Sequence, residues 1–308
     1  MAGAPLSLRT LAVDLGGTNM RAALVDGDGH VEEREEVATP PDPGRDGLVD
    51  LARSVMARGE VGDAVIGVPG RVDYGAGVLE YAPNLPPAWD DVLTEAVLRD
   101  ELGVEVALAN DADLAAVGEA WFGAGRDFCD VAYLTISTGI GAGVVAGGLL
   151  IHGRRSVAEV GHTIVDGRAL AEGEKATVEQ LGSGSALTEL AREAGLAEDG
   201  VGLIELVRAG NVTATRIFER VVHAAAIGAV SLAHLFTPEV IVVGGGLGLV
   251  GDLVLEPIRA LVAAQGPRAM PRPIRIVNAS LGDDAGLAGA GAWSRAFQPQ
   301  AASRVSRG

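Results

Sequence analysis

The stretch TLAVDLGGTNMRAALVD, Thr10 to Asp26, decides how the rest of the sequence is interpreted. Two apolar runs, each suited to a buried strand, are separated by Asp14 and a turn rich in glycine and hydroxyl groups. Glycine lets backbone N–H groups approach an anion closely, so such a turn suits phosphate oxygens. Asp14 would repel phosphate directly, but a carboxylate suits a hydrated Mg²⁺. By itself, the stretch also fits a plain β-hairpin.

A second stretch of the same construction lies in the middle of the chain. The segment VAYLTISTGIGAGVVAGGLL, Val131 to Leu150, places the turn STGIGAG between two apolar strands. Strand and helix patterns alternate after both hairpins, which predicts the α/β class and two similar halves. Two such turns, facing each other across a cleft, would hold a polyphosphate chain. The repetition therefore favours nucleotide binding over a plain hairpin.

The composition favours a globular protein and argues against several kinds of partner. The 308 residues are 48% apolar and 21% charged, which allows two domains with sizeable cores. The net charge of −17, without a local basic cluster, argues against nucleic acid as a partner. The single cysteine, Cys129, excludes an internal disulfide framework and any multi-cysteine metal site.

The most membrane-like segment is VVHAAAIGAVSLAHLF, Val221 to Phe236. It contains His223, Ser231 and His234, and it is shorter than the roughly 20 apolar residues that a membrane span needs. We interpret it as a buried helix and expect no membrane partner. The N-terminus shows no charged region followed by an apolar one, so we predict no signal peptide and a cytoplasmic protein.

A third glycine segment, VVGGGLG at Val242 to Gly248, follows another predicted strand. Gly246, Gly248 and Gly251 satisfy the dinucleotide pattern GxGxxG. However, the next strand is followed by Asn278 rather than by an acid that would bind a ribose. We interpret the segment as the floor of an adenosine pocket, where glycines leave room for the base. The sequence has no GxxxxGK[ST] motif, which excludes a P-loop nucleotide site.

The tripeptide Ala109–Asp111 closes one predicted strand and opens a helix. Asn and Asp are common helix N-caps, and for this stretch alone a cap is the simpler interpretation. The alternative is that Asp111 orients an attacking hydroxyl, because the base in phosphoryl transfer mainly positions the nucleophile. The segments AEVGH, Ala158–His162, and VEQLGSG, Val178–Gly184, add polar side chains that suit a polyol.

Together these motifs resemble those of the ROK family of sugar kinases and repressors, from about Leu11 to Phe297, and are most similar to its glucokinases. The segments that carry the resemblance are DLGGTN, PNLPPAW at Pro83–Trp89, NDADLAAVGE (the family's NDAN-type stretch), STGIGAG, AEVGH and VVGGGLG. The resemblance implies the actin-like, ribonuclease-H-like ATPase fold, with two similar α/β domains and a cleft between them. We expect a smaller domain at 1–109, a larger one at 110–283, a helix at about 284–298 that packs back on the first domain, and a disordered tail at 299–308.

The resemblance also implies roles for individual residues. Asp111 would be the catalytic base, and Asp14 would serve Mg²⁺ through water. The sugar would be held by Gly70, Asn84, Asn110, Asp111, Glu159, His162 and Glu179. The phosphates of ATP would be bound by Gly16, Gly17, Thr18, Asn19, Thr138 and Gly139, and its adenosine would lie near Gly244, Gly245 and Gly246.

One departure from the family pattern concerns a structural zinc ion. Most ROK members continue after GH into CxCGxxGCxE, whose cysteines bind zinc together with the His. Here residues 162–179 read HTIVDGRALAEGEKATVE, and Thr177 stands where the last cysteine would be. A closed zinc site cannot lose three of its four ligands, so we expect no zinc. Glu179, at the last position of the motif, is retained.

The activity that the resemblance implies is ATP-dependent phosphorylation of the 6-hydroxyl of a hexose, with glucose as the first candidate. Kinases for mannose, fructose, N-acetylmannosamine or N-acetylglucosamine are alternatives, as is polyphosphate as the donor. A sugar-sensing regulator is disfavoured, because the first phosphate loop begins about ten residues into the chain and no DNA-binding domain precedes it. A nicotinamide-dependent enzyme that uses Gly246–Gly251 is a further alternative. Since family members are often dimers or tetramers, we expect a homodimer.

Overall fold

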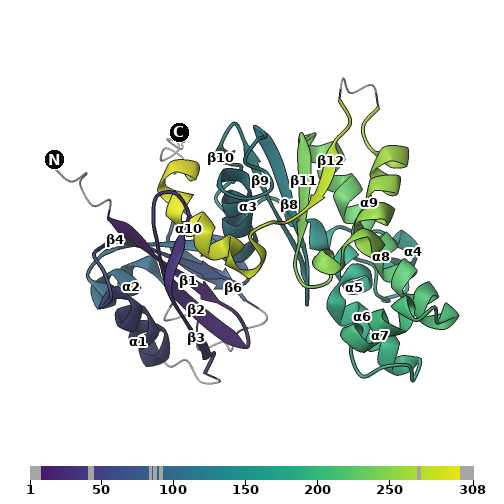
Figure 1. Cartoon of the computed structure of the whole chain (residues 1–308), viewed down its shortest axis with the longest axis horizontal. Coiled ribbons are helices and arrows are strands. Elements are labelled where there is room, and N and C mark those ends of the chain that lie inside the picture. The colour runs from purple at the N-terminus through teal and green to yellow at the C-terminus, as the bar shows by residue number, and fades with distance from the viewer. Residues whose placement is uncertain are drawn as a thin grey trace. The chain divides into compact units, whose positions relative to one another are not determined.

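The computed structural model describes residues 8–40, 45–82, 85, 89, 93–268 and 272–298 (Figure 1). The chain divides into two compact units. The first comprises Met1–Arg126, Gly147–Val157 and Asp283–Gly308, and the second comprises Asp127–Ala146 and Ala158–Gly282. The expected tail at 299–308 lies outside the described residues.

The first unit is built on a five-stranded sheet with the strand order β3-β2-β1-β4-β7. Strands β1 and β2 form an antiparallel hairpin, whereas β4 and β7 run parallel to β1. The elements of this unit are β1 (Arg9–Leu15), β2 (Asn19–Val25), β3 (Val31–Ala38), α1 (Arg45–Met56), β4 (Val61–Val68), β5 (Arg71–Asp73), β6 (Val78–Tyr81), α2 (Glu95–Leu102), β7 (Glu105–Asn110), α3 (Asp111–Trp121), β10 (Leu149–Leu150) and α10 (Ala285–Ala296), which follows the short turn η4 (Gly282–Asp284).

The central strands of this sheet are apolar on both faces because helices contact the sheet on both sides. In β1, Leu11, Ala12 and Val13 are all buried. Helix α1 packs against β2, and α10 packs against β1, β2 and β4. The outer strand β3, VEEREEVA, carries several exposed glutamates instead. Charge on such an edge discourages pairing with another strand.

Helices α3 and α10 pack with their backbones unusually close, and glycines allow it. A Cβ atom on Gly118 would lie 2.1 Å from the carbonyl oxygen of Ala285, and one on Gly289 would lie 2.0 Å from that of Leu114. This packing holds α3 in the first unit. The unit therefore continues to Arg126 instead of ending at residue 109, where the sequence had placed a boundary.

The second unit repeats the arrangement of hairpin and parallel strands. Its strands follow the order β9-β8-β11-β12, with β8 and β9 antiparallel and with β11 and β12 parallel to β8. The two similar α/β halves predicted from the sequence are thus confirmed. The elements are β8 (Asp130–Ile136), β9 (Ile140–Ala146), η2 (Val160–His162), α4 (Gly167–Ala171), α5 (Val178–Gly182), α6 (Gly184–Glu193), α7 (Gly200–Arg208), α8 (Val212–Phe236), β11 (Val240–Gly244), η3 (Gly248–Val250), α9 (Asp252–Gln265) and β12 (Arg275–Asn278).

Helix α8 is the one described helix that is long and apolar enough to cross a membrane by length and composition alone. More than half of its most apolar window is buried within the protein. Phe218, Val222 and Leu232 of this helix belong to the hydrophobic core of the second unit. Packing in the core therefore explains why α8 is apolar, in agreement with the buried helix predicted from the sequence.

Candidate functional site

The turn between β1 and β2 has a geometry that only glycine fits at its first position. The N–H of Gly16 donates to the carbonyl of Asn19 at 2.9 Å, and a Cβ atom on Gly16 would lie 2.7 Å from that oxygen. Thr39 holds the turn from outside, since its hydroxyl donates to the carbonyl of Gly16 at 2.6 Å. Gly17, Thr18 and Asn19 are exposed. The turn is thus accessible to a phosphate group, and the Asn19 amide donates to the Glu36 carboxylate at 3.1 Å.

Asp14 lies at the end of β1, directly across from Arg21 on β2. The Arg21 guanidinium donates to the Asp14 carboxylate at 2.5 Å and to the carbonyl of Asp283 at 3.2 Å. Burial raises the pKa of Asp14, and the charge and hydrogen bond of Arg21 oppose that effect. Arg21 was not singled out from the sequence, although a hairpin that turns at Gly16–Thr18 pairs it with Asp14.

The second turn, between β8 and β9, is tied to two helices of its own unit. The N–H of Ile140 donates to the Glu179 carboxylate at 2.8 Å. The N–H of Gly184 donates to the carbonyl of Ser137 at 2.7 Å. The Ser185 hydroxyl donates to the carbonyl of Thr138, also at 2.7 Å. A Cβ atom on Gly139 would lie 2.5 Å from a Glu179 carboxylate oxygen, so a larger residue there would displace that carboxylate. The structure therefore brings Glu179 and the predicted phosphate turn together.

The junction between β7 and α3 shows which residue is the N-cap of the helix, and so whether Asp111 has that role. Asn110, not Asp111, is the helix N-cap, because its side-chain oxygen accepts the N–H groups of Ala112 at 3.0 Å and Asp113 at 3.1 Å. The Asn110 amide also donates to the carbonyl of Gly70 at 2.9 Å. Asp111 is the first helical residue and is exposed. Asn110 therefore supplies the cap, and the Asp111 carboxylate adds one local contact of its own by accepting the N–H of Ala112 at 2.8 Å.

The predicted sugar loop is only partly described. Asn84 lies outside the described residues, whereas the neighbouring Leu85 and Trp89 are buried in the core of the first unit. Gly70 has a φ of +105°, and a Cβ atom there would lie 2.2 Å from the carbonyl of Tyr81. The predicted pocket-edge glycine is thus required by the backbone itself.

Three predicted sugar-binding residues gather in the second unit. Glu159 precedes η2 and His162 ends it, with the His162 ring nitrogen 3.8 Å from the Glu159 carboxylate. A Cβ atom on Gly161 would lie 3.4 Å from the Cβ of Glu179, which places α5 beside η2. Glu159 and His162 are both well exposed, so their polar atoms are accessible to a ligand.

The segment that replaces the zinc motif is closed by hydrogen bonds. Ile164 and Thr177 form an antiparallel bridge, and the N–H of Val178 donates to the carbonyl of Thr163 at 3.0 Å. Thr177 then begins α5 with a capping box, in which its side chain and that of Gln180 each accept a backbone N–H of the other. This threonine, in the place of a cysteine, therefore contributes to fixing the helix that carries Glu179.

The third glycine segment lies against the second turn. Gly245 has a φ of +81°, and a Cβ atom there would lie 2.6 Å from the carbonyl of Ile136. A cavity of about 710 Å³ opens in the second unit beside Thr138 and Gly246. Its further lining residues include Ser185, Leu187, Thr188, Arg192, Ile204 and Leu247. Sequence reasoning missed the residues from α6 and α7, because only the fold brings them to the glycines.

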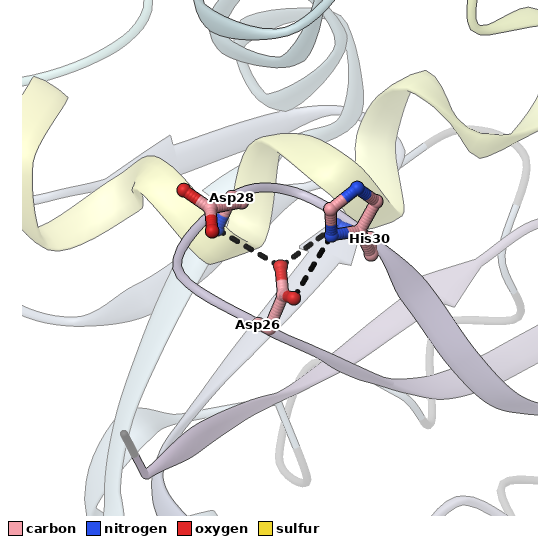
Figure 2. A group of neighbouring side chains, drawn as sticks. All are labelled: Asp26, Asp28 and His30. Carbon is pink, nitrogen blue, oxygen red and sulfur yellow. Dashed lines mark hydrogen bonds and ion pairs between the residues drawn. The ribbon is translucent and has the colours of Figure 1, made fainter. Parts of the chain in front are cut away.

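A separate cluster in the first unit consists of Asp26, Asp28 and His30, at the turn between β2 and β3 (Figure 2). The Asp26 carboxylate accepts the N–H groups of Asp28 and His30 at 2.9 Å each, and it also pairs with the His30 ring. The hydrogen bond to Asp26 raises the pKa of His30. These contacts are those of a side chain that shapes a tight turn. The cluster is therefore accounted for as part of the hairpin.

Comparison with known proteins places the chain in a family. A sequence model described as the ROK family matches residues 10–296. The chain belongs to the ROK family. The resemblance deduced from the glycine turns and the NDAD segment is thereby confirmed, and with it the actin-like α/β fold.

Individual ROK proteins resemble this one along most of its length. A glucokinase from Thermotoga maritima is 33% identical over 92% of this chain and 96% of its own. The crystal structure of a ROK family glucokinase from Streptomyces griseus, in complex with glucose and AMPPNP, is 32% identical with a TM-score of 0.79, covering 93% of this chain and 99% of that one. The ROK hexokinase from Thermus thermophilus is also 32% identical, with a TM-score of 0.78 and coverage of 92% and 97%.

Proposed function

We propose that this ROK protein is an ATP-dependent kinase that phosphorylates the 6-hydroxyl of a hexose, with glucose as the first candidate. The observation that carries the proposal is the start of α3, where Asn110 supplies the helix cap and Asp111 remains exposed. The similarity to a glucokinase solved with glucose and AMPPNP supports both the sugar and the nucleotide.

In the proposed reaction Asp111 orients the sugar hydroxyl and accepts its proton as the phosphoryl group is transferred. The transition state of such transfers is loose, so positioning of the nucleophile contributes more than strong basicity. We assign Gly70, Asn84 and Asn110 to the sugar on the first unit. On the second unit we assign Glu159, His162 and Glu179 to it.

The phosphates are assigned to the two hairpin turns, with Gly16, Gly17, Thr18 and Asn19 on one and Thr138 and Gly139 on the other. Gly244, Gly245 and Gly246 are assigned to adenosine beside the cavity of the second unit. Asp14 fits Mg²⁺, because this ion prefers hard oxygen ligands and usually keeps several waters. When bound, the ion would neutralise charge on the phosphates, while Arg21 holds the Asp14 carboxylate in place.

A coupled assay of ADP release over a panel of sugars tests the function. We expect glucose to give the highest kcat/KM among glucose, mannose, fructose, N-acetylmannosamine and N-acetylglucosamine. Replacing ATP by polyphosphate, with glucose 6-phosphate as the readout, tests the donor. Sugar binding without turnover of any sugar or donor would contradict the kinase proposal and favour a sugar-sensing regulator.

We further propose that the protein folds without structural zinc, because residues 162–179 contain no cysteine. Metal analysis of the purified protein is expected to find far less than one zinc per chain. Treatment with a zinc chelator is expected to leave the melting temperature unchanged. Stoichiometric zinc, or a chelator-dependent fall in melting temperature, would contradict this proposal.

Glu179 is expected to support nucleotide use through its bond to the second turn. Glu179→Ala removes the acceptor of the Ile140 N–H and should lower kcat/KM for ATP about tenfold, since hydrogen bonds to charged groups contribute roughly 1.5–3 kcal/mol. Glu179→Gln keeps an acceptor and should lose less. Glu172→Ala, at an exposed glutamate of the same unit, serves as the control. An ATP dependence unchanged in Glu179→Ala would contradict the role.

We also expect the protein to be cytoplasmic and a homodimer. Light scattering coupled to gel filtration, with and without glucose, measures the oligomeric state directly.

A further inference from the structure

Tyr74 lies immediately after β5 in the first unit, and its hydroxyl reaches the start of α3. It donates to the Asp113 carboxylate at 2.6 Å and accepts the backbone N–H of Asn110 at 3.3 Å. Asp113 and Asn110 are both buried. One hydroxyl therefore bridges the residue before Asp111 and the residue two positions after it.

The ring of Tyr74 is held by aromatic neighbours from distant parts of the chain. His152 and Phe297 meet it edge-on, with ring centroids 5.6 and 5.1 Å away, and Trp293 lies 6.1 Å away. The backbone N–H of Tyr74 donates to the carbonyl of Arg154 at 2.9 Å. With the ring and backbone both fixed, the position of the hydroxyl is determined by the fold rather than by the local turn.

The hydroxyl of Tyr74 remains a donor under all ordinary conditions. Burial and the adjacent Asp113 carboxylate raise its pKa well above the usual value for tyrosine. A buried carboxylate is stable only when polar groups hydrogen-bond to it. Loss of the contact between Tyr74 and Asp113 would therefore destabilise the folded protein. The N–H groups of Ala112 and Asp113 are already bound by the Asn110 cap. What Tyr74 adds is a constraint on the first turn of α3 from outside the helix.

We propose that Tyr74 is a positioning residue for Asp111. It clamps the backbone at Asn110 and the side chain of Asp113, and so fixes the direction in which the Asp111 carboxylate points. This inference rests on the proposed function, in which Asp111 orients the sugar hydroxyl. Because a misplacement of about 1 Å can lower a rate about a hundredfold, the clamp should affect turnover more than binding.

Tyr74→Phe tests the proposal, because it removes only the hydroxyl. We expect kcat for the preferred sugar to fall between about tenfold and a hundredfold, while KM for sugar and for ATP changes less than about threefold. Tyr81→Phe removes the hydroxyl of an exposed tyrosine in the same unit and is expected to leave kcat unchanged. Melting temperatures are measured for both variants, so that a loss of folded protein is not mistaken for a loss of turnover.

Asp113→Ala provides the second test, because it removes the acceptor of the Tyr74 hydroxyl, and it does not depend on the stability of Tyr74→Phe. If the clamp acts through Asp113, this variant also lowers kcat without raising KM, and the double variant loses less than the product of the single losses. Normal kcat in both single variants would overturn the inference. So would a parallel change in kcat, KM and melting temperature, which indicates a merely structural role. Absence of any kinase activity in the unaltered protein would instead refute the proposed function.

Discussion

Asp111→Asn is expected to lower kcat by about a thousandfold or more while leaving the Kd for the sugar within about threefold. General-base groups typically contribute 10²- to 10⁴-fold, and an amide of the same shape cannot accept the proton. The helix should tolerate the change, because the cap of α3 is Asn110 and the Asp111 side chain is exposed. A small loss of stability, about 0.3–1 kcal/mol, follows from removing a negative charge at a helix N-terminus.

The measurement combines steady-state kinetics with calorimetric titration of the sugar. Asp100→Asn, at an exposed aspartate of the same unit, removes the same charge away from the site and should behave like the unaltered protein. Retention of more than about a tenth of kcat in Asp111→Asn would show that another group accepts the proton. A rise in the Kd for the sugar, in proportion to the fall in kcat, would instead assign Asp111 to sugar binding.

Gly289→Ala is expected to destabilise the first unit by about 3 kcal/mol, although it adds a single methyl group. The new Cβ atom would lie 2.0 Å from the Leu114 carbonyl, which is backbone and cannot rotate away. Helix α10 must therefore move from α3, and overpacking of this kind commonly costs 1–3 kcal/mol or more. Because α3 begins at Asp111, the movement should also lower kcat.

The matched control for Gly289→Ala lies one turn earlier in the same helix. Apart from its chain neighbours and the nearby backbone of its own helix, a Cβ atom on Gly286 would have no described atom within 4 Å, so Gly286→Ala meets no obstacle. We expect Gly286→Ala to be neutral or to stabilise by up to about 1 kcal/mol, because alanine favours the helix over glycine. Urea unfolding of both variants, followed separately for the two units where their transitions differ, measures the contrast. Equal stabilities of the two variants would show that α3 and α10 do not require the close approach.

Local patterns in the sequence predicted much of the fold, because each depends on neighbouring residues. The apolar runs on either side of DLGGTN and STGIGAG predicted both hairpins and the duplicated α/β construction. The buried character of α8 also followed from composition. The boundary at residue 109 was wrong because it depends on α10, which contacts α3 from more than 160 positions later in the chain.

The same distinction applies to the candidate site. Glu179 and the second turn were singled out separately, but only the structure shows the hydrogen bond between them. Tyr74 escaped notice because nothing near it in sequence indicates its contact with Asp113. Asp111 could not be separated from a helix cap until Asn110 was seen to fill that position. Contacts between distant segments carry this information, and a single sequence does not display them.

The place of α10 after the second unit in the chain has a consequence for how the protein is made. The strands of the first unit are translated before the second unit, whereas the helix that packs on β1, β2 and β4 is translated after it. During synthesis, one apolar face of that sheet therefore stays exposed to solvent while the whole second unit emerges and folds. Nascent chains that stop before Ala285 should bind chaperones or aggregate, and slow translation of the second unit should prolong that exposure.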